Sequence, residues 1–379
     1  MQIEYLTLAN FRNIYSLSVE FSPFLNILWG ENGQGKTNII ESLYLIATSR
    51  SFRAVHDHEL VSWNESSCHL DTTISNDSRQ IRIDADIFLN HSLNRSKKQF
   101  KVDNLPITRF SKLLGLIPIV LFTPQDLEIV KGSPSFRRGY LDFILSQTSP
   151  FYLDTLQRYH TALEHKNTLL REKGESVKKQ EITPWNEQIV MSGSILIERR
   201  LNLIDKLSPL IETASSIFSN NSETVKTCYN STIPSLENSC ERGQIESLFY
   251  NELEKRQKEE LYRRQSLVGL HRDDLSVFLN NQPIKIFGSQ GQQRSASLAL
   301  KFAEWHYINN VMETPPVLLL DDIFSELDKN RCKAIFELIQ KTGQTFITTT
   351  ESSCFKYDDI NIPISWFKIV KGGSYVLTA

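Results

Sequence analysis

The sequence predicts an α/β protein in which both ends of the chain build one nucleotide-binding head around an inserted all-helical arm. Three observations predict it: a glycine-rich loop near the N-terminus, an apolar strand with two aspartates near the C-terminus, and long polar helices between them. Strands that alternate with helices favour a parallel sheet. We therefore assign residues 1–132 and 265–379 to the two parts of the head, and residues 133–264 to the arm.

The glycine-rich loop fits the phosphate-binding pattern G-x-x-x-x-G-K-[ST]. An apolar run at residues 24–29 precedes it and apolar residues at helical spacing follow it, which is the strand–loop–helix setting that phosphate binding requires. We predict that the loop binds ATP or GTP, with the Lys36 ammonium on the β- and γ-phosphates and the Thr37 hydroxyl on Mg²⁺. The alternative is a chance match in a turn. The predicted nucleotide-binding residues are Gly30, Glu31, Asn32, Gly33, Gln34, Gly35, Lys36 and Thr37.

The apolar strand at residues 317–320 ends in Asp321 and Asp322. Carboxylates in this position lie at the carboxyl edge of a parallel sheet, where nucleotide sites form. We predict that Asp321 holds Mg²⁺ through water and that Asp322 orients or deprotonates the attacking water. The alternative is an acidic cap for the next helix, which the presence of the phosphate-binding loop disfavours.

A third motif precedes the predicted helix at residues 290–310. Ser289 stands near the N-terminus of this helix, and Gly291 permits close approach of a ligand to the backbone. The motif therefore suits an anion, although an ordinary serine cap is the better explanation of Ser289 when the motif is considered alone.

Composition limits the function classes. The formal net charge of −2 excludes a general electrostatic attraction to nucleic acid, so DNA contacts require local basic patches. One candidate patch is a predicted hairpin turn, whose alternative is an ordinary solvated turn. Its candidate DNA-binding residues are Arg95, Lys97, Lys98 and Lys101.

No apolar run is long enough to span a bilayer, and the five cysteines are scattered without metal-ligand spacing. We therefore expect a cytoplasmic protein without a membrane partner. His271 with Asp273 and Asp274 resembles a metal cluster, but one histidine and two adjacent acids on a strand cannot all face one ion.

The order of these motifs resembles that of the ABC and SMC class of ATPases: phosphate loop, glutamine loop, signature, acidic strand and a Ser-x-x-Asp turn, here residues 325–328. Within this class the sequence resembles the RecF family of bacterial DNA replication and repair proteins. The matching segments are residues 6–13, 30–37, 50–53, 122–127, 131–134, 137–138, 271–274, 289–294 and 318–328.

The resemblance implies a P-loop ABC-type head that hydrolyses ATP slowly and dimerises around it. The loop of one subunit and the signature of the other would hold each ATP, and Gln125 would sense Mg²⁺ and the γ-phosphate. Asp322 replaces the glutamate of most transporter-type members and Thr350 replaces their histidine, so we predict slow turnover with Lys36, Asp322 and Thr350 as the catalytic residues. The signature residues expected to act in trans are Ser289, Gly291, Gln292 and Asp328.

The implied function is a weak, DNA-stimulated ATPase switch in recombinational repair and replication, linked to the SOS response. It would bind single-stranded and duplex DNA at gaps, with RecR and RecO as partners, and help to load recombinase. Two other functions remain open: a transporter ATPase subunit, which requires a membrane partner, and a nucleotide-binding scaffold without enzymatic activity.

Overall fold

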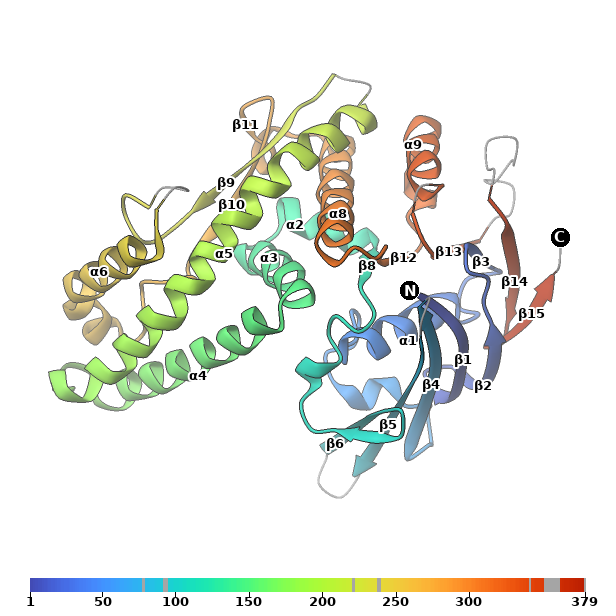
Figure 1. The fold of residues 1–379 in the computed structure, drawn as a ribbon, viewed down its shortest axis with the longest axis horizontal. Helices are drawn as coiled ribbons and strands as arrows, with labels where there is room; N and C mark the ends of the chain where they lie inside the picture. Colours follow the sequence, from blue (N-terminus) through green and yellow to red (C-terminus); the bar gives the residue numbers. More distant parts are fainter. Residues whose placement is uncertain are drawn as a thin grey trace. The chain divides into compact units, whose positions relative to one another are not determined.

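The computed structural model describes residues 1–76, 79–90, 95–219, 222–236, 240–340, 342–350 and 362–377 (Figure 1). Contacts within the chain divide it into two compact units. The first unit consists of Met1–Asp126 and Ile308–Ala379, so it is built from both ends of the chain, as the sequence predicted. The second unit is Leu127–Tyr307.

The nucleotide-binding part of the first unit is a sheet in the order β15-β14-β3-β13-β12-β8. All neighbours pair in parallel except β14 and β15, which pair antiparallel. The central strands β3, β13 and β12 are almost continuously buried, which is typical of a parallel sheet covered on both faces. The strands are β3 (Leu25–Trp29), β8 (Ile119–Phe122), β12 (Val317–Leu320), β13 (Thr345–Thr349), β14 (Ile364–Val370) and β15 (Gly373–Leu377).

A second sheet in this unit is antiparallel, in the order β2-β1-β4-β5-β6-β7. The predicted hairpin at its start is confirmed, because Leu8 of β1 lies opposite Leu17 of β2. Its strands are β1 (Gln2–Phe11), β2 (Ile14–Glu20), β4 (Ser67–Asn76), β5 (Arg79–Asn90), β6 (Arg95–Val102) and β7 (Leu105–Ile107). Among its described residues, this unit also contains the helices α1 (Lys36–Thr48) and α9 (Lys329–Ile339), besides short 3₁₀ helices and the end of the helix at Gln290–Met312.

Parallel pairing brings four chain segments to one edge of the nucleotide-binding sheet. The carboxyl ends of β3, β13, β12 and β8 lead to the phosphate-binding loop, Thr350, Asp321 and Gln125 respectively. This edge is where α/β proteins bind nucleotides. The fold thereby joins residues that lie almost 300 positions apart in the sequence.

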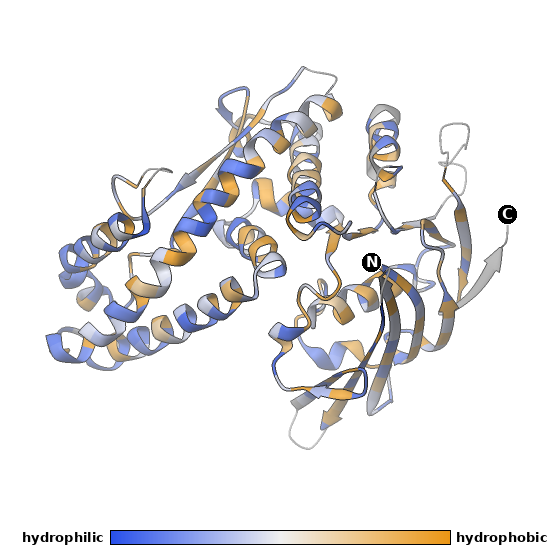
Figure 2. Cartoon of the chain, in the orientation of Figure 1, coloured by the Kyte–Doolittle hydropathy of each residue, from blue (hydrophilic) through white to orange (hydrophobic). Residues whose placement is uncertain are grey.

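The second unit is mostly helical. Figure 2 shows apolar and polar residues on different sides of α4 and α5, whose buried positions recur at helical spacing. Its helices are α2 (Leu127–Lys131), α3 (Pro134–Thr148), α4 (Pro150–Lys173), α5 (Lys179–Ser219), α6 (Arg242–Arg263), α7 (Ile284–Phe287) and most of α8 (Gln290–Met312). A small sheet in the order β11-β10-β9 accompanies them, with β9 (Val225–Asn230), β10 (Asp274–Leu279) and β11 (Gln282–Pro283).

The units differ from the three-part division of the sequence in three respects, the smallest being that residues 127–132 belong to the helical unit. The arm contains the strand β9 and is therefore not entirely helical. Residues 265–307 belong to the helical unit, because β10 pairs along its whole length with β9. Pairing between distant strands is set by tertiary contacts that local sequence patterns do not contain.

Candidate nucleotide-binding site

The phosphate-binding loop connects β3 to α1 and depends on its glycines. The backbone φ angles of Gly30, Gly33 and Gly35 are 151°, 79° and 110°. Residues that carry a side chain rarely adopt such positive values. A Cβ atom on Gly30 would also lie 2.5 Å from the carbonyl oxygen of Ile369 on β14. The loop conformation therefore requires glycine at these positions, and it ends at the N-terminus of α1, whose positive dipole end favours phosphate.

Lys36 folds back over the loop. Its Nζ atom donates to the carbonyl oxygens of Gly30 and Glu31, at 2.7 and 2.8 Å. Burial lowers the pKa of Lys36, and the nearby carboxylates of Asp322 and Asp321 oppose this effect. The ammonium is thus held inside the loop beside two carboxylates, which is the position from which it can contact bound phosphates.

Asp321 lies beside Thr37 at the floor of the site. The hydroxyls of Thr37 and Thr348 both donate to Asp321 Oδ1, each at 2.8 Å. Hydroxyl and carboxylate oxygens are the ligands that Mg²⁺ prefers, and the Asp321 side chain is almost fully buried. The residues present therefore fit Mg²⁺ at the position that the sequence predicted.

Burial raises the pKa of Asp321, while hydrogen bonds from Thr348 and Thr37 act in the opposite direction. A carboxyl group whose pKa is higher in the folded than in the unfolded protein stabilises the fold fully at pH values below its pKa in the unfolded protein. This stabilisation is lost as the pH rises through its pKa in the folded protein. At neutral pH, the buried carboxylate therefore destabilises the nucleotide-free protein.

We expect Asp321→Asn to increase the unfolding free energy of the nucleotide-free protein at pH 7 by about 1 kcal/mol, with a smaller gain at pH 4. An asparagine oxygen can still accept both hydroxyl hydrogen bonds, whereas Mg²⁺-dependent ATP binding should be lost. Thermal unfolding in EDTA across this pH range measures the effect. A variant that is less stable than the wild type at pH 7 would contradict it.

Asp322 has an unusual backbone. Its φ angle is 51°, in the left-handed region, and its N–H donates to Thr348 Oγ1 at 2.9 Å. Among residues other than glycine, aspartate and asparagine tolerate this conformation best. The strand end therefore favours aspartate over the longer glutamate found in most transporter-type members, and it fixes the direction in which the carboxylate leaves the backbone.

Lys36, Thr37 and Asp322 line one pocket in the first unit, and Asp321 adjoins it through its hydrogen bond from Thr37. The predicted loop residues Gly30, Glu31 and Gln34 are not among the lining residues. Predicted residues from both ends of the chain meet there, including the predicted catalytic residues Lys36, Asp322 and Thr350. The lining residues are Asn32, Gly33, Gly35, Lys36, Thr37, Asn38, Arg53, Asp322, Thr348 and Thr350.

Four pocket or loop residues received no role from the sequence: Thr348, Asn13, Asn38 and Arg53. Asn13 Nδ2 donates to the carbonyl of Gly33 at 2.9 Å and Asn13 Oδ1 accepts from Asn38, so Asn13 ties the β1–β2 turn to the loop. Arg53 Nη1 donates to Asn38 Oδ1 at 2.9 Å, which extends this series of hydrogen bonds. Asn13 and Arg53 belong to segments that marked the family resemblance, and this was the only signal for them in the sequence.

Arg53 is the second cation in the pocket lining, and its side chain is 42% exposed. We expect Arg53→Gln to weaken ATP binding about fivefold to tenfold, and less in high salt, because it removes a partly screened positive charge. Fluorescence titration with a labelled ATP analogue at two salt concentrations measures this effect. Arg50→Gln, which changes an exposed arginine outside the pocket lining, is the control. Equal losses in both variants would contradict a specific contact.

Other predicted site residues lie outside this pocket. Gln125 is exposed in a short 3₁₀ helix after β8, on the correct sheet edge, but it is not among the lining residues. In the second unit, Ser289 Oγ accepts from the N–H of Gln292 at 3.3 Å and the Gln292 side chain accepts from the N–H of Ser289, so these two residues cap α8. Asp328 caps α9 by accepting from the Arg331 N–H at 3.0 Å.

The candidate DNA-binding cations do not form one patch. They were predicted in a turn, but β6 begins at Arg95, and alternation along the strand places Lys97 and Lys101 on the face opposite to Lys98. Lys98 forms an ion pair with Asp57 at 2.8 Å, and Lys101 lies 4.0 Å from Asp86. Of the three lysines, Lys97 is exposed and has no ion pair within the described residues, so a DNA contact of this strand remains a prediction.

The segment at residues 271–274 has a structural role in the helical unit. Asp274 accepts two hydrogen bonds from Arg137 at 2.7 and 2.8 Å, and Tyr159 shares a hydrogen bond with His271 Nδ1 at 2.7 Å. Asp273 accepts from Tyr229 Oη at 2.7 Å. These bonds join β10 and the residues before it to α3, α4 and β9.

Comparison with known proteins identifies the family. The RecF/RecN/SMC N terminal domain model matches residues 2–367. The DNA replication and repair protein RecF of Halothermothrix orenii is 36% identical over 375 residues, covering 98% of both chains. That of Streptococcus thermophilus is 38% identical over 350 residues, covering 92% of both. The chain belongs to the RecF family.

Solved structures of RecF have the same fold. The recombination mediator protein RecF-ATP in the RecFOR pathway superposes with a TM-score of 0.89 at 31% identity, over 100% of this chain and 98% of that one. The RecF-ATPrS structure gives 0.88 at 30% identity. An SMC head bound to the C-winged helix domain of ScpA, at 16% identity and a TM-score of 0.56, shares the fold alone.

Proposed function

We propose that this chain is an ATP-dependent DNA-binding protein of recombinational repair and replication, and that ATP switches it from monomer to dimer. Its relatives in the RecF family are DNA replication and repair proteins, and one of them is a recombination mediator with bound ATP. The observation that carries the proposal is the 2.8 Å hydrogen bond between Thr37 and Asp321, which joins the phosphate-binding loop to the acidic strand across 284 residues.

Each residue of the site has a proposed role in ATP hydrolysis. The loop N–H groups and Lys36 bind the phosphates, and Thr37 and Asp321 hold Mg²⁺, which would neutralise charge on the phosphates. Asp322 projects into the pocket from a fixed backbone and orients or deprotonates the attacking water. Thr350 can donate a hydrogen bond to the γ-phosphate but supplies no charge, so we expect slow turnover.

Dimerisation supplies the groups that this pocket lacks. Asp328, the predicted signature residue that belongs to the first unit, is not among the residues that line the pocket. Ser289 is exposed at the N-terminus of the 23-residue helix α8, and this position suits an anion brought by a second molecule. We propose that Ser289, Gly291 and Gln292 of one subunit complete the ATP site of the other. Asp328 would lie at the contact between the two subunits.

The biological setting follows from the relatives. The RecFOR pathway of the solved RecF structures suggests RecR and RecO as partners. We propose that the protein acts in the cytoplasm at single-strand gaps, where it helps to load recombinase during the SOS response, with DNA stimulating a weak ATPase activity.

The rival functions make different predictions. A transporter subunit would act with a separate membrane partner. None of the helices in the described part of the chain could span a bilayer. A scaffold without enzymatic activity would bind ATP without hydrolysing it. Phosphate release with and without DNA therefore separates the scaffold from an ATPase.

Fluorescence anisotropy on gapped, single-stranded and duplex DNA tests the proposal. We expect binding to gapped DNA to be tighter with ATP than with ADP, and phosphate release to increase on addition of this DNA. Equal DNA affinity with ATP, with ADP and without nucleotide would overturn the coupling of ATP to DNA binding.

A further inference from the structure

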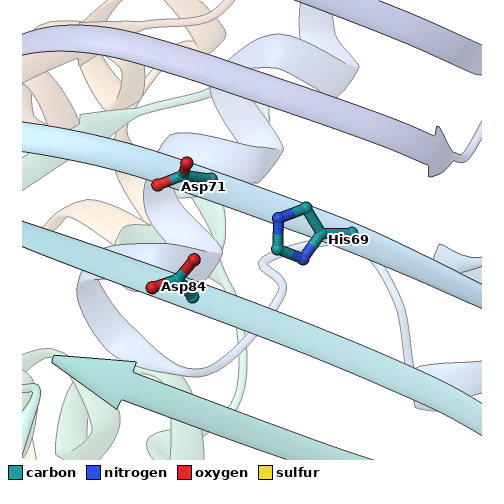
Figure 3. Close-up of side chains that lie close together, drawn as sticks. All are labelled: His69, Asp71 and Asp84. Carbon is teal, nitrogen blue, oxygen red and sulfur yellow. The ribbon is translucent and has the colours of Figure 1, made fainter. Parts of the chain in front are cut away.

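A separate polar cluster lies on the antiparallel sheet of the first unit. His69 and Asp71 are two residues apart on β4 and therefore lie on the same face of the sheet. Asp84 lies opposite Asp71 on β5, so the three side chains share this face (Figure 3). One possible ligand atom from each residue lies within 4.8 Å of the others. Neither strand contributes a residue to the ATP pocket, so this cluster is distinct from it.

Asp84 is the most unusual member of the cluster. Its side chain is 10% exposed, and its Oδ2 atom is buried without a hydrogen-bond partner. The other oxygen, Oδ1, lies 3.3 Å from Arg82 Nη2. A buried carboxylate oxygen without a donor is costly unless a proton or a cation neutralises it. Asp84 Oδ2 is therefore an unused ligand atom within the cluster.

His69 is oriented to act as a ligand. Its Nδ1 atom lies 2.8 Å from Asp86 Oδ1, and Figure 3 shows the opposite edge of the ring facing Asp71 and Asp84. A neutral imidazole that donates Nδ1–H to a carboxylate presents the lone pair of Nε2 to the cluster. A carboxylate behind a histidine is the arrangement that orients histidine ligands in many metal sites.

The positive charges next to the cluster are carried by exposed side chains. Arg82 donates to both oxygens of Asp71, at 3.0 and 2.6 Å, but its side chain is 51% exposed and can move aside. Lys101 lies 4.0 Å from Asp86. Lys97 shares this face of β6 with Lys101, so Arg82, Lys97 and Lys101 match the formal charge of Asp71, Asp84 and Asp86, and a bound metal ion would have to displace Arg82.

We propose that His69, Asp71 and Asp84 bind one divalent transition-metal ion, with Zn²⁺ as the best match. One imidazole nitrogen and two carboxylate oxygens are a typical zinc ligand set, and a water molecule completes it. Mg²⁺ suits the site less because it prefers oxygen ligands alone. Ligands of tetrahedral Zn²⁺ lie about 3.4 Å apart, so small side-chain rotations close the cluster around the ion. The ion would link β4 to β5 and displace Arg82.

Isothermal titration of the nucleotide-free full chain with Zn²⁺ under reducing conditions tests the site. We expect His69→Gln and Asp84→Asn to weaken one Zn²⁺-binding event at least tenfold, and Arg82→Gln to strengthen it because a competing cation is removed. His165→Gln is the control; this exposed imidazole stacks on Trp185 in the other unit and should leave binding unchanged.

Thermal unfolding gives a second readout. Zn²⁺ should raise the unfolding temperature of the wild type and of Arg82→Gln but not that of His69→Gln, and equal Mg²⁺ should raise none of them. The unfolding temperatures without metal show that the variants are folded. Zn²⁺ binding that is the same in all four variants, or that Arg82→Gln weakens, would overturn the proposal.

Discussion

Lys36→Ala should weaken ATP binding about 100-fold or more and abolish ATP hydrolysis, because it removes the ammonium that neutralises phosphate charge in a buried loop. The variant should remain folded. Burial already lowers the pKa of Lys36, so the folded protein bears a cost for this cation, and its removal leaves the sheet and α1 intact.

Equilibrium binding of a fluorescent ATP analogue, combined with thermal unfolding, measures both expectations. Lys97→Ala is the matched control, because Lys97 is an exposed lysine on β6 outside the pocket lining and should leave ATP affinity unchanged. If Lys36→Ala bound ATP as tightly as the wild type, the loop would not be the phosphate site.

Asp322→Asn should reduce ATP turnover by about 100-fold or more while ATP binding persists, because it removes a general base or water-orienting carboxylate and keeps the backbone. Asparagine tolerates the φ angle of 51° at this position. ATP binding and single-turnover phosphate release separate the two effects.

Asp322→Gly distinguishes the carboxylate from the backbone. Glycine relieves the left-handed strain, so we expect an increase in unfolding free energy of about 1 kcal/mol together with the same loss of turnover. Asp322→Glu should retain some turnover but lose stability. Normal turnover in Asp322→Asn would exclude the carboxylate from the chemical step.

The sequence was sufficient to predict the sheet edge that carries the site. The apolar runs before Gly30 and before Asp321 are long enough to be identified as buried strands, and glycine spacing restricted the loop to one conformation. These signals are local, and local patterns identify the ends of parallel strands well.

The sequence did not reveal the residues that complete the pocket. Thr348, Asn13 and Arg53 reach the site from three other segments, and a threonine, an asparagine and an arginine in strands or turns have many ordinary roles. The basic run at residues 95–101 was predicted as a turn because its many charges do not look like a strand. In the structure it is a strand whose side chains alternate between the two faces, and Phe100 lies in the core. Only the pairing with β5 makes this alternation visible.

The molecular mass in solution, measured by light scattering with ATP and Mg²⁺, tests the proposed switch most directly. The chain has a mass of 43.7 kDa. For Asp322→Asn, which should retain ATP, we expect twice this mass with ATP and the single mass without it. Adding Ser289→Arg to the same background should keep the single mass while ATP still binds. A mass that stays at the monomer value with bound ATP would contradict a site completed by a second subunit.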